Sequence, residues 1–595
     1  MVATFKKDQI LMVVFFLIGG IYLNIINISI SYQVQPYAFY TDYISLTNIV
    51  KSPSGLAEGL ANAIGQFLGY RLWSTIILTL LSVIIFYFSR KIFSLFKLKS
   101  SLTLGFSMLV TVTIFAPLKD YSFPLFYIIQ FILAIIFVYL YFITKTRTLL
   151  FSILKFLFLA LMLVHVAGGI ALIYLGIIII LGEYLQSDNK KLVFGFIVAF
   201  SIVGILHIAA NYIYHFTFKE IILGKDFLTY NYGNFKYYLI LYSILPISLI
   251  ILKIVNNKPI SENKLLFSML AIIISASIII LFPFDKNINN QYKVRYYARS
   301  GQWEEILKLA GDLQSNDRII NFYTNQALFF TDKYTTDLFK YPQEWGEYAL
   351  HLGYFTERST LMDNSDLFYH LGHIGAAKYW ALEAHINAEN DPYILQRLTE
   401  LFIIMGNYKA ALRFARKLST SLLHKDIAAY YIQCINDSST LQSDYTLMLK
   451  KRQMLKNNFF INKKEPIAEL SLLLKEDSAN QMAVKYLLAF YLMKLELTPF
   501  IKALEKYYPK DAYLPEIYEQ AILVYLTKYN LEKNWPLRNK TIERFKSYIG
   551  VINYYNGNLE VAKESLRNSF GDTYWYYMQF VCPIITKKEI KIEYE

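Results

Sequence analysis

The sequence has 595 residues, of which 55% are hydrophobic, and its mean hydropathy is +0.33. These values are typical of membrane proteins, and the length predicts at least two domains. The net charge is +14, but residues 1–285 hold 20 Lys and Arg against 10 Asp and Glu, whereas the remainder holds 39 against 35. The basic excess therefore accompanies the apolar segments, as membrane topology requires, and no nucleic-acid partner is predicted.

The pattern of the chain changes at about residue 285. Long apolar runs with short basic loops give way to a polar sequence with helical periodicity. We predict an all-α protein: a polytopic transmembrane helix bundle in residues 1–285, followed by an extracytoplasmic tetratricopeptide-like α-solenoid in residues 286–595. A membrane span needs about 20 apolar residues, and about nine runs approach this length. These runs are 10–30, 72–89, 101–117, 124–143, 148–164, 167–184, 192–210, 237–254 and 265–284.

Two stretches of the apolar half leave alternatives open. The runs within 101–143 and those within 148–184 either cross the membrane fully or form re-entrant hairpins, and the loss of one pair keeps the number of spans odd. The segment 52–67 has a Pro-x-Gly break followed by an amphipathic pattern. It is expected to lie along the membrane surface or to re-enter the membrane.

The loops between the runs predict the orientation. One alternate set of loops holds thirteen Lys and Arg and the other set holds six. Because Lys- and Arg-rich short loops stay in the cytoplasm, the N-terminus is predicted to be cytoplasmic. An odd number of spans then places residues 286–595 outside, which means the periplasm if the membrane is a bacterial inner membrane, or a lumen in a eukaryote. The long loops 31–71 and 211–236 lie on the same outer side.

Four segments of the second half share one signature, in which a glycine is followed by a large apolar residue two places on and by Ala or Ile five places on. Their glycines are Gly301, Gly372, Gly406 and Gly557. Gly372 and Gly406 are 34 residues apart, which is the tetratricopeptide period. A generic helical domain is the alternative, and residues 440–540 have helical periodicity without a repeat glycine. A superhelix of such repeats would bind a protein partner along its concave face.

Four ionisable residues near the outer ends of the runs are candidates for function. Asp42, in the first outer loop, could be a general base or hold a cation, and otherwise is a solvated loop acid or a helix cap. Arg71 could bind a lipid phosphate or act as an interfacial anchor. His165 and His207 could line a polar cavity as ligand-binding residues, or bond to backbone carbonyls at helix ends. Lys155, inside a run, would snorkel or pair.

Known catalytic signatures give no further guidance. The sequence has no P-loop, no His-Glu-x-x-His and no Gly-x-Ser-x-Gly motif. Its two cysteines build neither a disulfide framework nor a zinc site. No metal site is predicted, and the cofactor requirement is left unknown.

Five short segments, in this order along the chain, make it resemble a known group of proteins. They are Pro53-Ser54-Gly55-Leu56, Gln66-Phe67-Leu68, Trp303-Glu304-Glu305-Ile306-Leu307, Leu338-Phe339-Lys340-Tyr341-Pro342-Gln343 and Phe368-Tyr369-His370-Leu371-Gly372. The chain resembles an uncharacterised group of multi-pass membrane proteins from Bacteroides-type bacteria with a C-terminal tetratricopeptide-like region, although Ser54 stands where that group would have glycine. More distantly, its architecture is similar to that of GT-C glycosyltransferases with tetratricopeptide repeats, in which Asp42 would be the loop acid.

Two functions follow as hypotheses. In the first, the chain is a non-catalytic inner-membrane protein that contacts membrane lipids and docks a protein partner through its periplasmic repeats. In the second, it is a glycosyltransferase that uses a polyprenyl-linked sugar at the outer face, with Asp42 as its catalytic residue. A lipid or solute transporter is less favoured, because few charged residues lie within the runs.

Overall fold

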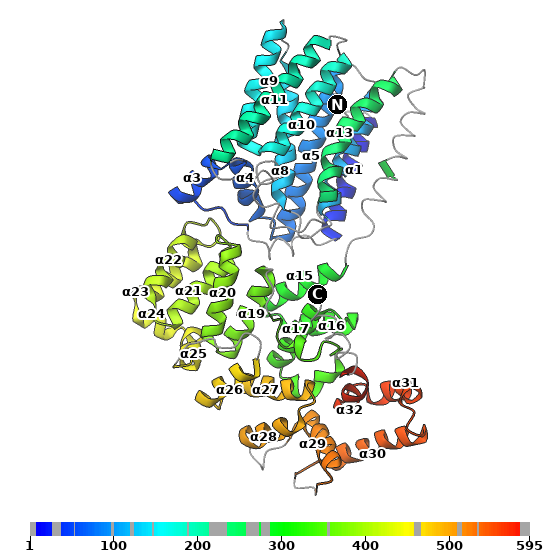
Figure 1. The fold of residues 1–595 in the computed structure, drawn as a ribbon, viewed down its shortest axis with the longest axis vertical. Helices are drawn as coiled ribbons and strands as arrows, with labels where there is room; N and C mark the ends of the chain where they lie inside the picture. The colour runs from blue at the N-terminus through cyan, green and yellow to red at the C-terminus, as the bar shows by residue number, and fades with distance from the viewer. Residues whose placement is uncertain are drawn as a thin grey trace, which may run out of the picture. The chain divides into compact units, whose positions relative to one another are not determined.

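The computed structural model describes most of the chain. The described residues are 7–25, 37–52, 54–96, 100–118, 124–144, 148–186, 190–213, 235–256, 273–274, 286–353, 358–456, 466–508, 514–531 and 535–582. Within these ranges the structure is all-helical, and the one pairing of extended residues is an isolated antiparallel bridge between Tyr40 and Ser421. The chain forms two compact units (Figure 1). Unit 1 comprises Met1–Asn289 with Thr420–Leu423, and unit 2 comprises Asn290–Ser419 with His424–Glu595.

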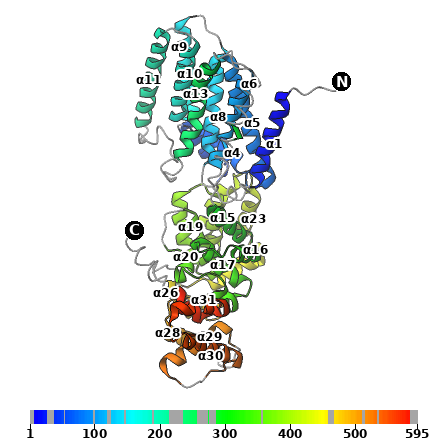
Figure 2. The same ribbon diagram turned by 90° about the vertical axis from the view of Figure 1, so that its right-hand side faces the viewer.

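Unit 1 is a bundle of apolar helices, several of which run side by side in both ribbon views (Figures 1 and 2). Its helices are α1 (Lys7–Ile25), α3 (Tyr43–Lys51), α4 (Gly55–Gly65), α5 (Arg71–Leu95), α6 (Ser100–Val112), α7 (Phe115–Leu118), α8 (Leu125–Ile143), α9 (Leu149–Ala167), α10 (Gly169–Gln186), α11 (Lys190–Ile213) and α13 (Phe235–Asn256). The helix α8 lies in the core and buries most of its side chains, including Phe131, Ile135 and Val138. A helix that is apolar on all sides is stable in such a position because other helices surround it.

Three described helices are long and apolar enough to cross a membrane, namely α5, α8 and α9. The prediction of about nine spans is therefore too high for the described residues. The other apolar helices of unit 1 are shorter, at Gln9–Ile25, Leu102–Leu118, Gly169–Leu185, Gly195–Ala209 and Leu239–Ile251. Of the predicted run 265–284, only residues 273–274 lie within the described residues.

The two ambiguous stretches contain real breaks. The first run, 101–117, is divided into α6 and the single turn α7, with Thr113 and Ile114 between them. The second stretch is divided at Gly168, whose φ of +84° lies in the region that favours glycine. Since α9 ends at Ala167 and α10 begins at Gly169, one residue connects two packed helices.

The described part of the predicted long loop 31–71 is largely helical. Residues 43–51 and 55–65 form α3 and α4. The helix α4 buries Gly55, Ala57, Gly59, Ala61 and Gly65, and it packs against α8 and α9. Small residues allow helix backbones to approach closely. The segment predicted to lie on the membrane surface or to re-enter therefore packs against α8 and α9, while its Gly55 and Gly59 face Ile49 of α3 and its Gly65 faces Tyr37.

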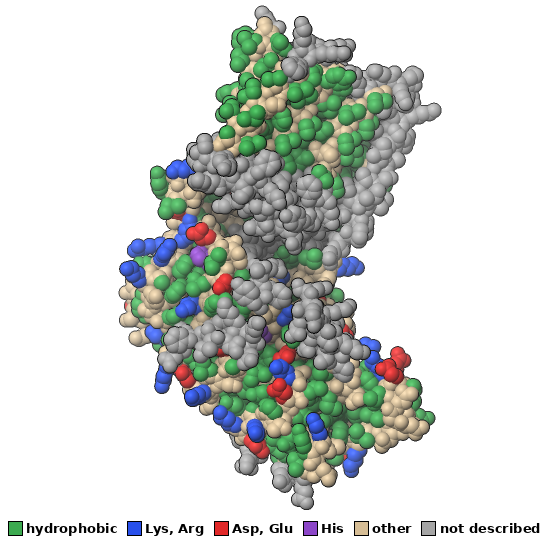
Figure 3. Space-filling view, viewed as in Figure 1, with side chains coloured by type: hydrophobic (Ala, Val, Ile, Leu, Met, Phe, Trp, Pro, Cys, Tyr) green, Lys and Arg blue, Asp and Glu red, His purple; other side chains and the backbone are tan. Residues whose placement is uncertain are grey.

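Apolar side chains also cover the outside of unit 1. On α9, Leu150 and Phe158 are 64% and 60% exposed, and Leu154 and Leu161 are exposed beside them. Figure 3 shows hydrophobic side chains over most of the described surface of unit 1, whereas charged side chains of both signs gather over unit 2. An apolar surface of this extent suits contact with lipid chains.

Unit 2 is built from shorter amphipathic helices. They are α15 (Lys286–Arg299), which begins just before the unit boundary, α16 (Trp303–Leu313), α17 (Arg318–Phe330), α18 (Tyr334–Asp337), η3 (Leu338–Lys340), η4 (Gly346–Ala349), α19 (Arg358–Leu371), α20 (Ile374–Asn387), α21 (Pro392–Ile404), α22 (Tyr408–Ser419), α23 (Lys425–Asn436), α24 (Ser438–Ser443), α25 (Tyr445–Gln453), α26 (Pro466–Glu476), α27 (Gln481–Met493), α28 (Leu497–Tyr507), α29 (Glu516–Tyr529), α30 (Asn539–Tyr554), α31 (Leu559–Phe570), α32 (Tyr574–Tyr576) and η5 (Tyr577–Val581). Neighbouring helices in the chain pack together, as in the pairs α19 with α20 and α21 with α22.

The predicted turn glycines connect these pairs. Gly301, Gly372, Gly406 and Gly557 each have a positive φ, between +68° and +85°, and each lies between two helices. The residue five places after each glycine is buried, as the close approach of paired helices requires. These residues are Ile306, Ala377, Ala411 and Ala562. The predicted helix boundaries at the four signatures are therefore confirmed.

Turns of the same kind also occur without a glycine, one at Asp332 and one at Leu495. Leu495, between α27 and α28, has a φ of +58°, and Glu496 N donates to Tyr491 O. At the Gly406 turn, Asn407 N donates to Phe402 O in the same way. A leucine in this conformation costs about 1–2 kcal/mol, and its presence explains why a search for glycines does not find the turn.

Candidate functional site

Asp42 is a helix cap. Its carboxylate accepts a hydrogen bond from the backbone N–H of Ser45 at 3.0 Å, at the start of α3, and another from Thr420 Oγ1 at 3.2 Å. The segment Thr420–Leu423 belongs to unit 1, and Thr41 N donates to Thr420 O beside the carboxylate. Of the roles considered for Asp42, the geometry matches the cap.

The other three predicted site residues lie in different surroundings. Arg71, at the start of α5, donates through Nε to Asn24 Oδ1 of α1 at 2.7 Å. His165 is exposed in the last turn of α9, whereas His207 is buried in α11. These three residues and Asp42 are not among the residues that line the pocket between α1, α5 and α6 of unit 1.

Lys155 pairs inside the bundle. Its Nζ donates to the carbonyl oxygens of Tyr141 and Thr144, at 2.8 and 2.6 Å, and lies 4.0 Å from the centre of the Tyr141 ring. The Tyr141 hydroxyl in turn donates to Glu183. Lys155 therefore satisfies carbonyls at the C-terminal end of α8, which is a structural use of a lysine in a helix bundle.

The densest charged site of the described residues lies in unit 2, and we refer to it as the arginine–tyrosine cluster. It begins with Arg295 of α15, which contacts both carboxylate oxygens of Asp363 through Nε and places Nη2 2.9 Å from Oδ2. The Tyr323 hydroxyl of α17 donates to the same carboxylate at 2.6 Å. Only 4% of the Arg295 side chain and 1% of the Asp363 side chain are exposed, so this is a buried ion pair.

The cluster continues across α19, α21 and α23. Arg397 donates through Nε and Nη2 to Asp366 Oδ1 and through Nη1 to Glu400 Oε2, at 3.2, 3.0 and 2.7 Å. The Tyr393 hydroxyl donates to Asp366 and the Tyr431 hydroxyl donates to Glu400. Two carboxylates and two phenols therefore hold one guanidinium in place, which gives it a fixed geometry.

Arg299 differs from the two other arginines. Its guanidinium carbon lies 3.9 Å from the centre of the Tyr393 ring. Within the described residues it forms no ion pair, and its buried Nε has no hydrogen-bond partner. Burial lowers the pKa of Arg299, but Tyr393 and Asp366 outweigh this effect and raise it, so Arg299 is a cation. Stacking on a phenol occupies the face of a guanidinium and leaves its N–H donors in the plane of the group.

Positive charge also acts on the neighbouring groups. Burial, with Arg397 and Lys450 nearby, lowers the pKa of His370 to about 3, so this histidine is neutral. Burial, with a contribution from Arg397, lowers the pKa of Lys450 to about 8. Lys450 Nζ donates to His370 O at 2.8 Å. The described residues of the cluster contain no arrangement typical of a nucleophile with a base.

Sequence reasoning missed this cluster, although signals for it exist. Tyr393, Arg397 and Glu400 follow helical spacing of four and three residues, which places them on one face of α21. The run from Asp363 to Asp366 is polar throughout, yet apolar residues flank it on both sides. A polar run in the middle of an apolar helix is a sign of buried polar interactions.

The fold and the site together define a class: a helical protein with helices able to cross a membrane, joined to a unit of helix pairs with a buried ionic cluster. The chain belongs to a family of unknown function, DUF6057, whose sequence model matches residues 4–581. No curated protein and no solved structure matches it.

Proposed function

We propose that the chain is a multi-pass inner-membrane protein whose unit 2 is an extracytoplasmic tetratricopeptide-like solenoid that docks a protein partner. The partner would present a carboxylate, from Asp, Glu or a chain terminus, to Arg299. The observation that carries this proposal is the state of Arg299, which is stacked on Tyr393 without an ion-pair partner among the described residues. A carboxylate bound there would gain a charge-assisted hydrogen bond, which is worth about 1.5–3 kcal/mol.

The interior of unit 1 supports a scaffold rather than an enzyme. Its central helix α8 is surrounded by apolar side chains, including Phe156, Leu163 and Leu175. Asp42, the acid on which sugar transfer would depend, bonds to the backbone at the start of α3. The apolar core around α8 and the capping carboxylate of Asp42 suit anchorage of unit 2 more than chemistry on a lipid-linked substrate.

The repeat character of unit 2 rests on period and turn geometry. Gly372 and Gly406 are separated by the tetratricopeptide length, and their turns have matching positive φ values. Stacked helix pairs leave an extended face on which partners bind. The cluster spans α15, α17, α19, α21 and α23, so it connects several helix pairs of unit 2.

The test is site-specific photo-crosslinking of the full-length protein in its native membrane. A photoreactive side chain at position 300, an exposed residue next to Arg299, should give a discrete product. Mass spectrometry should locate the linkage in a partner segment that contains an acidic residue or a chain terminus. Arg299→Glu should abolish the product, because it replaces the cation with a repelling charge.

Arg413→Glu is the matched control, since Arg413 is an exposed arginine of α22 outside the cluster. It should leave the product unchanged. A product that survives Arg299→Glu, or the absence of any product at position 300, would contradict the proposal.

A further inference from the structure

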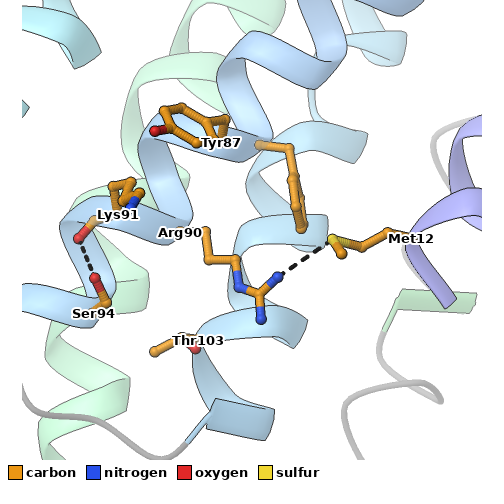
Figure 4. A pocket seen from close by; sticks show the side chains of 7 residues that line it. Met12, Tyr87, Arg90, Lys91, Ser94 and Thr103 are labelled. Atoms are coloured by element: carbon orange, nitrogen blue, oxygen red, sulfur yellow. Dashed lines mark hydrogen bonds between the residues drawn. The ribbon is translucent and has the colours of Figure 1, made fainter. Parts of the chain in front are cut away.

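A pocket of about 530 Å³ lies in unit 1, between α1, α5 and α6 (Figure 4). Its volume is in the range of small-molecule sites. Seven side chains line it: Met12, Phe86, Tyr87, Arg90, Lys91, Ser94 and Thr103. Two of them are cations, three carry hydroxyl groups (Tyr87, Ser94 and Thr103), two are the apolar Met12 and Phe86, and none is acidic.

Arg90, Lys91 and Ser94 of the pocket come from successive turns near the C-terminal end of α5, and Thr103 comes from α6. Arg90 and Ser94 are four residues apart, so they lie on one face of the helix. Figure 4 shows Arg90 extending from α5 toward Met12 of α1, and its Nη1 lies 3.3 Å from Met12 Sδ. Arg90 and Lys91 are the two cations among the lining residues, and guanidinium and ammonium groups are the side chains that bind phosphate oxygens. Lys91 is exposed beside Arg90.

An apolar stripe leads along α5 to these cations. Ile76, Leu80, Val83 and Tyr87 are exposed and follow helical spacing toward Lys91. At about 1.5 Å per residue, the stripe from Ile76 to Lys91 is about 22 Å long, which exceeds the roughly 15 Å of one hydrocarbon leaflet. The surface thus combines a path for an acyl chain with cations at its end.

We propose that this pocket binds the headgroup of an anionic phospholipid, with Arg90 and Lys91 on the phosphate and an acyl chain along the stripe. A free phosphate would use the cations but not the apolar path, so the stripe favours the lipid. The predicted topology places Arg90 and Lys91 on the cytoplasmic side, and basic pockets between helices on that side suit anionic headgroups.

Native mass spectrometry of the full-length protein in detergent tests the proposal with phosphatidylglycerol and phosphatidylcholine as probes. Phosphatidylglycerol should bind at least about tenfold more tightly, a difference of about 1.4 kcal/mol. Arg90→Gln combined with Lys91→Gln should remove this preference. Lys409→Gln combined with Arg413→Gln makes the same change in charge at exposed residues of α22, outside the pocket, and should keep it.

Two further measurements keep the test decisive. The exchange Arg90→Lys with Lys91→Arg retains both charges, and it should keep the preference even if the double Gln variant is unstable. Inorganic phosphate at millimolar concentration should not displace the lipid. Equal binding of the two lipids, a preference that survives in the double Gln variant, or displacement by phosphate would each overturn the proposal.

Discussion

The helices α9 of unit 1 and α19 of unit 2 differ in which side chains they expose and which they bury. On α9, large apolar residues such as Leu150 and Phe158 are exposed. On α19, the polar run from Asp363 to Asp366 is buried, and each of its residues has hydrogen-bond partners. A helix that exposes apolar groups gains from an apolar surrounding, whereas a helix that buries polar groups requires satisfied hydrogen bonds.

This difference is what an apolar surrounding for unit 1 and an aqueous one for unit 2 would require. In unit 2, arginine side chains lie in the interior. Carboxylates neutralise their charge there, and hydrogen bonds from phenols to these carboxylates fix the geometry. In the described part of unit 1, Arg71 and Arg90 lie near the two ends of α5, where a cation can reach the membrane interface. Four changes would break or sharpen this contrast, from the largest expected effect to the smallest.

Removal of one partner from the buried pair of unit 2 should have the largest effect. Arg295→Ala leaves Asp363 buried without its cation and should lower the free energy of unfolding of unit 2 by about 3–5 kcal/mol. This free energy is measured by guanidinium unfolding of the full-length protein in detergent, with tryptophan fluorescence as the signal. The signal reports on unit 2 because five of the six tryptophans belong to it.

Two variants serve as controls for this measurement. Arg295→Met combined with Asp363→Leu removes both charges and should recover most of the loss. Arg544→Ala removes a partly exposed arginine that pairs with Glu516 and Asp572, and it should cost about 1 kcal/mol or less. Equal losses for the Arg295 and Arg544 variants would show that burial does not set the strength of the first pair.

A charge on the apolar surface of unit 1 should be nearly as costly. Phe158 lies at the middle of α9, and Phe158→Lys should add about 2.5–3.5 kcal/mol to the free energy of membrane insertion. The measurement is the fraction of protein that resists extraction from membranes by alkaline carbonate. Ile386→Lys changes a 78% exposed residue of α20 in unit 2 and should leave that fraction unchanged. An equal effect of both changes would contradict the lipid-facing position of α9.

The stability of unit 2 should depend on pH through His351. Burial, together with the Arg318 guanidinium, lowers the pKa of His351 to about 4, and its Nδ1 accepts a hydrogen bond from Gly353 N. The unfolded chain has a histidine pKa near 6.5, so it binds a proton before the folded chain does. The stabilisation is therefore fully present well above pH 6.5 and is lost as the pH falls through about 4, with about 1.6 kcal/mol lost between pH 6.5 and 5.

The variant His351→Asn isolates this contribution. It keeps an acceptor near Gly353 and cannot be protonated in this range, so its free energy of unfolding should fall less steeply between pH 6.5 and 5. Guanidinium unfolding at several pH values gives both slopes. Identical slopes for the two proteins would assign the acid sensitivity to other groups.

The smallest effect is expected at Asp42 and separates the cap from the catalytic role. Asn caps helices about as well as Asp, so Asp42→Asn should change stability by less than about 0.5 kcal/mol, whereas Asp42→Ala should cost about 1 kcal/mol. In complementation of a deletion strain, Asp42→Asn should preserve function at normal protein levels. Loss of function with a folded protein would instead revive the glycosyltransferase hypothesis.

The sequence predicted the features that depend on local chemistry. Glycine at a positive φ fixes a turn without long-range contacts, and the helix boundaries at Gly301, Gly372, Gly406 and Gly557 followed from it. The apolar runs predicted α5, α8 and α9 in the same way, because an uninterrupted apolar helix needs no distant partner to be recognised.

Tertiary structure alone decided where polar side chains meet. The partner of Arg295 is 68 residues away, that of Arg397 on Asp366 is 31 residues away, and Asp42 contacts Thr420 across 378 residues. Leu495 holds a turn that its own preference opposes, because packing on both sides outweighs the local cost. Local preferences therefore specified the helices and several of their ends, whereas the ion pairs depended on contacts between residues far apart in the chain.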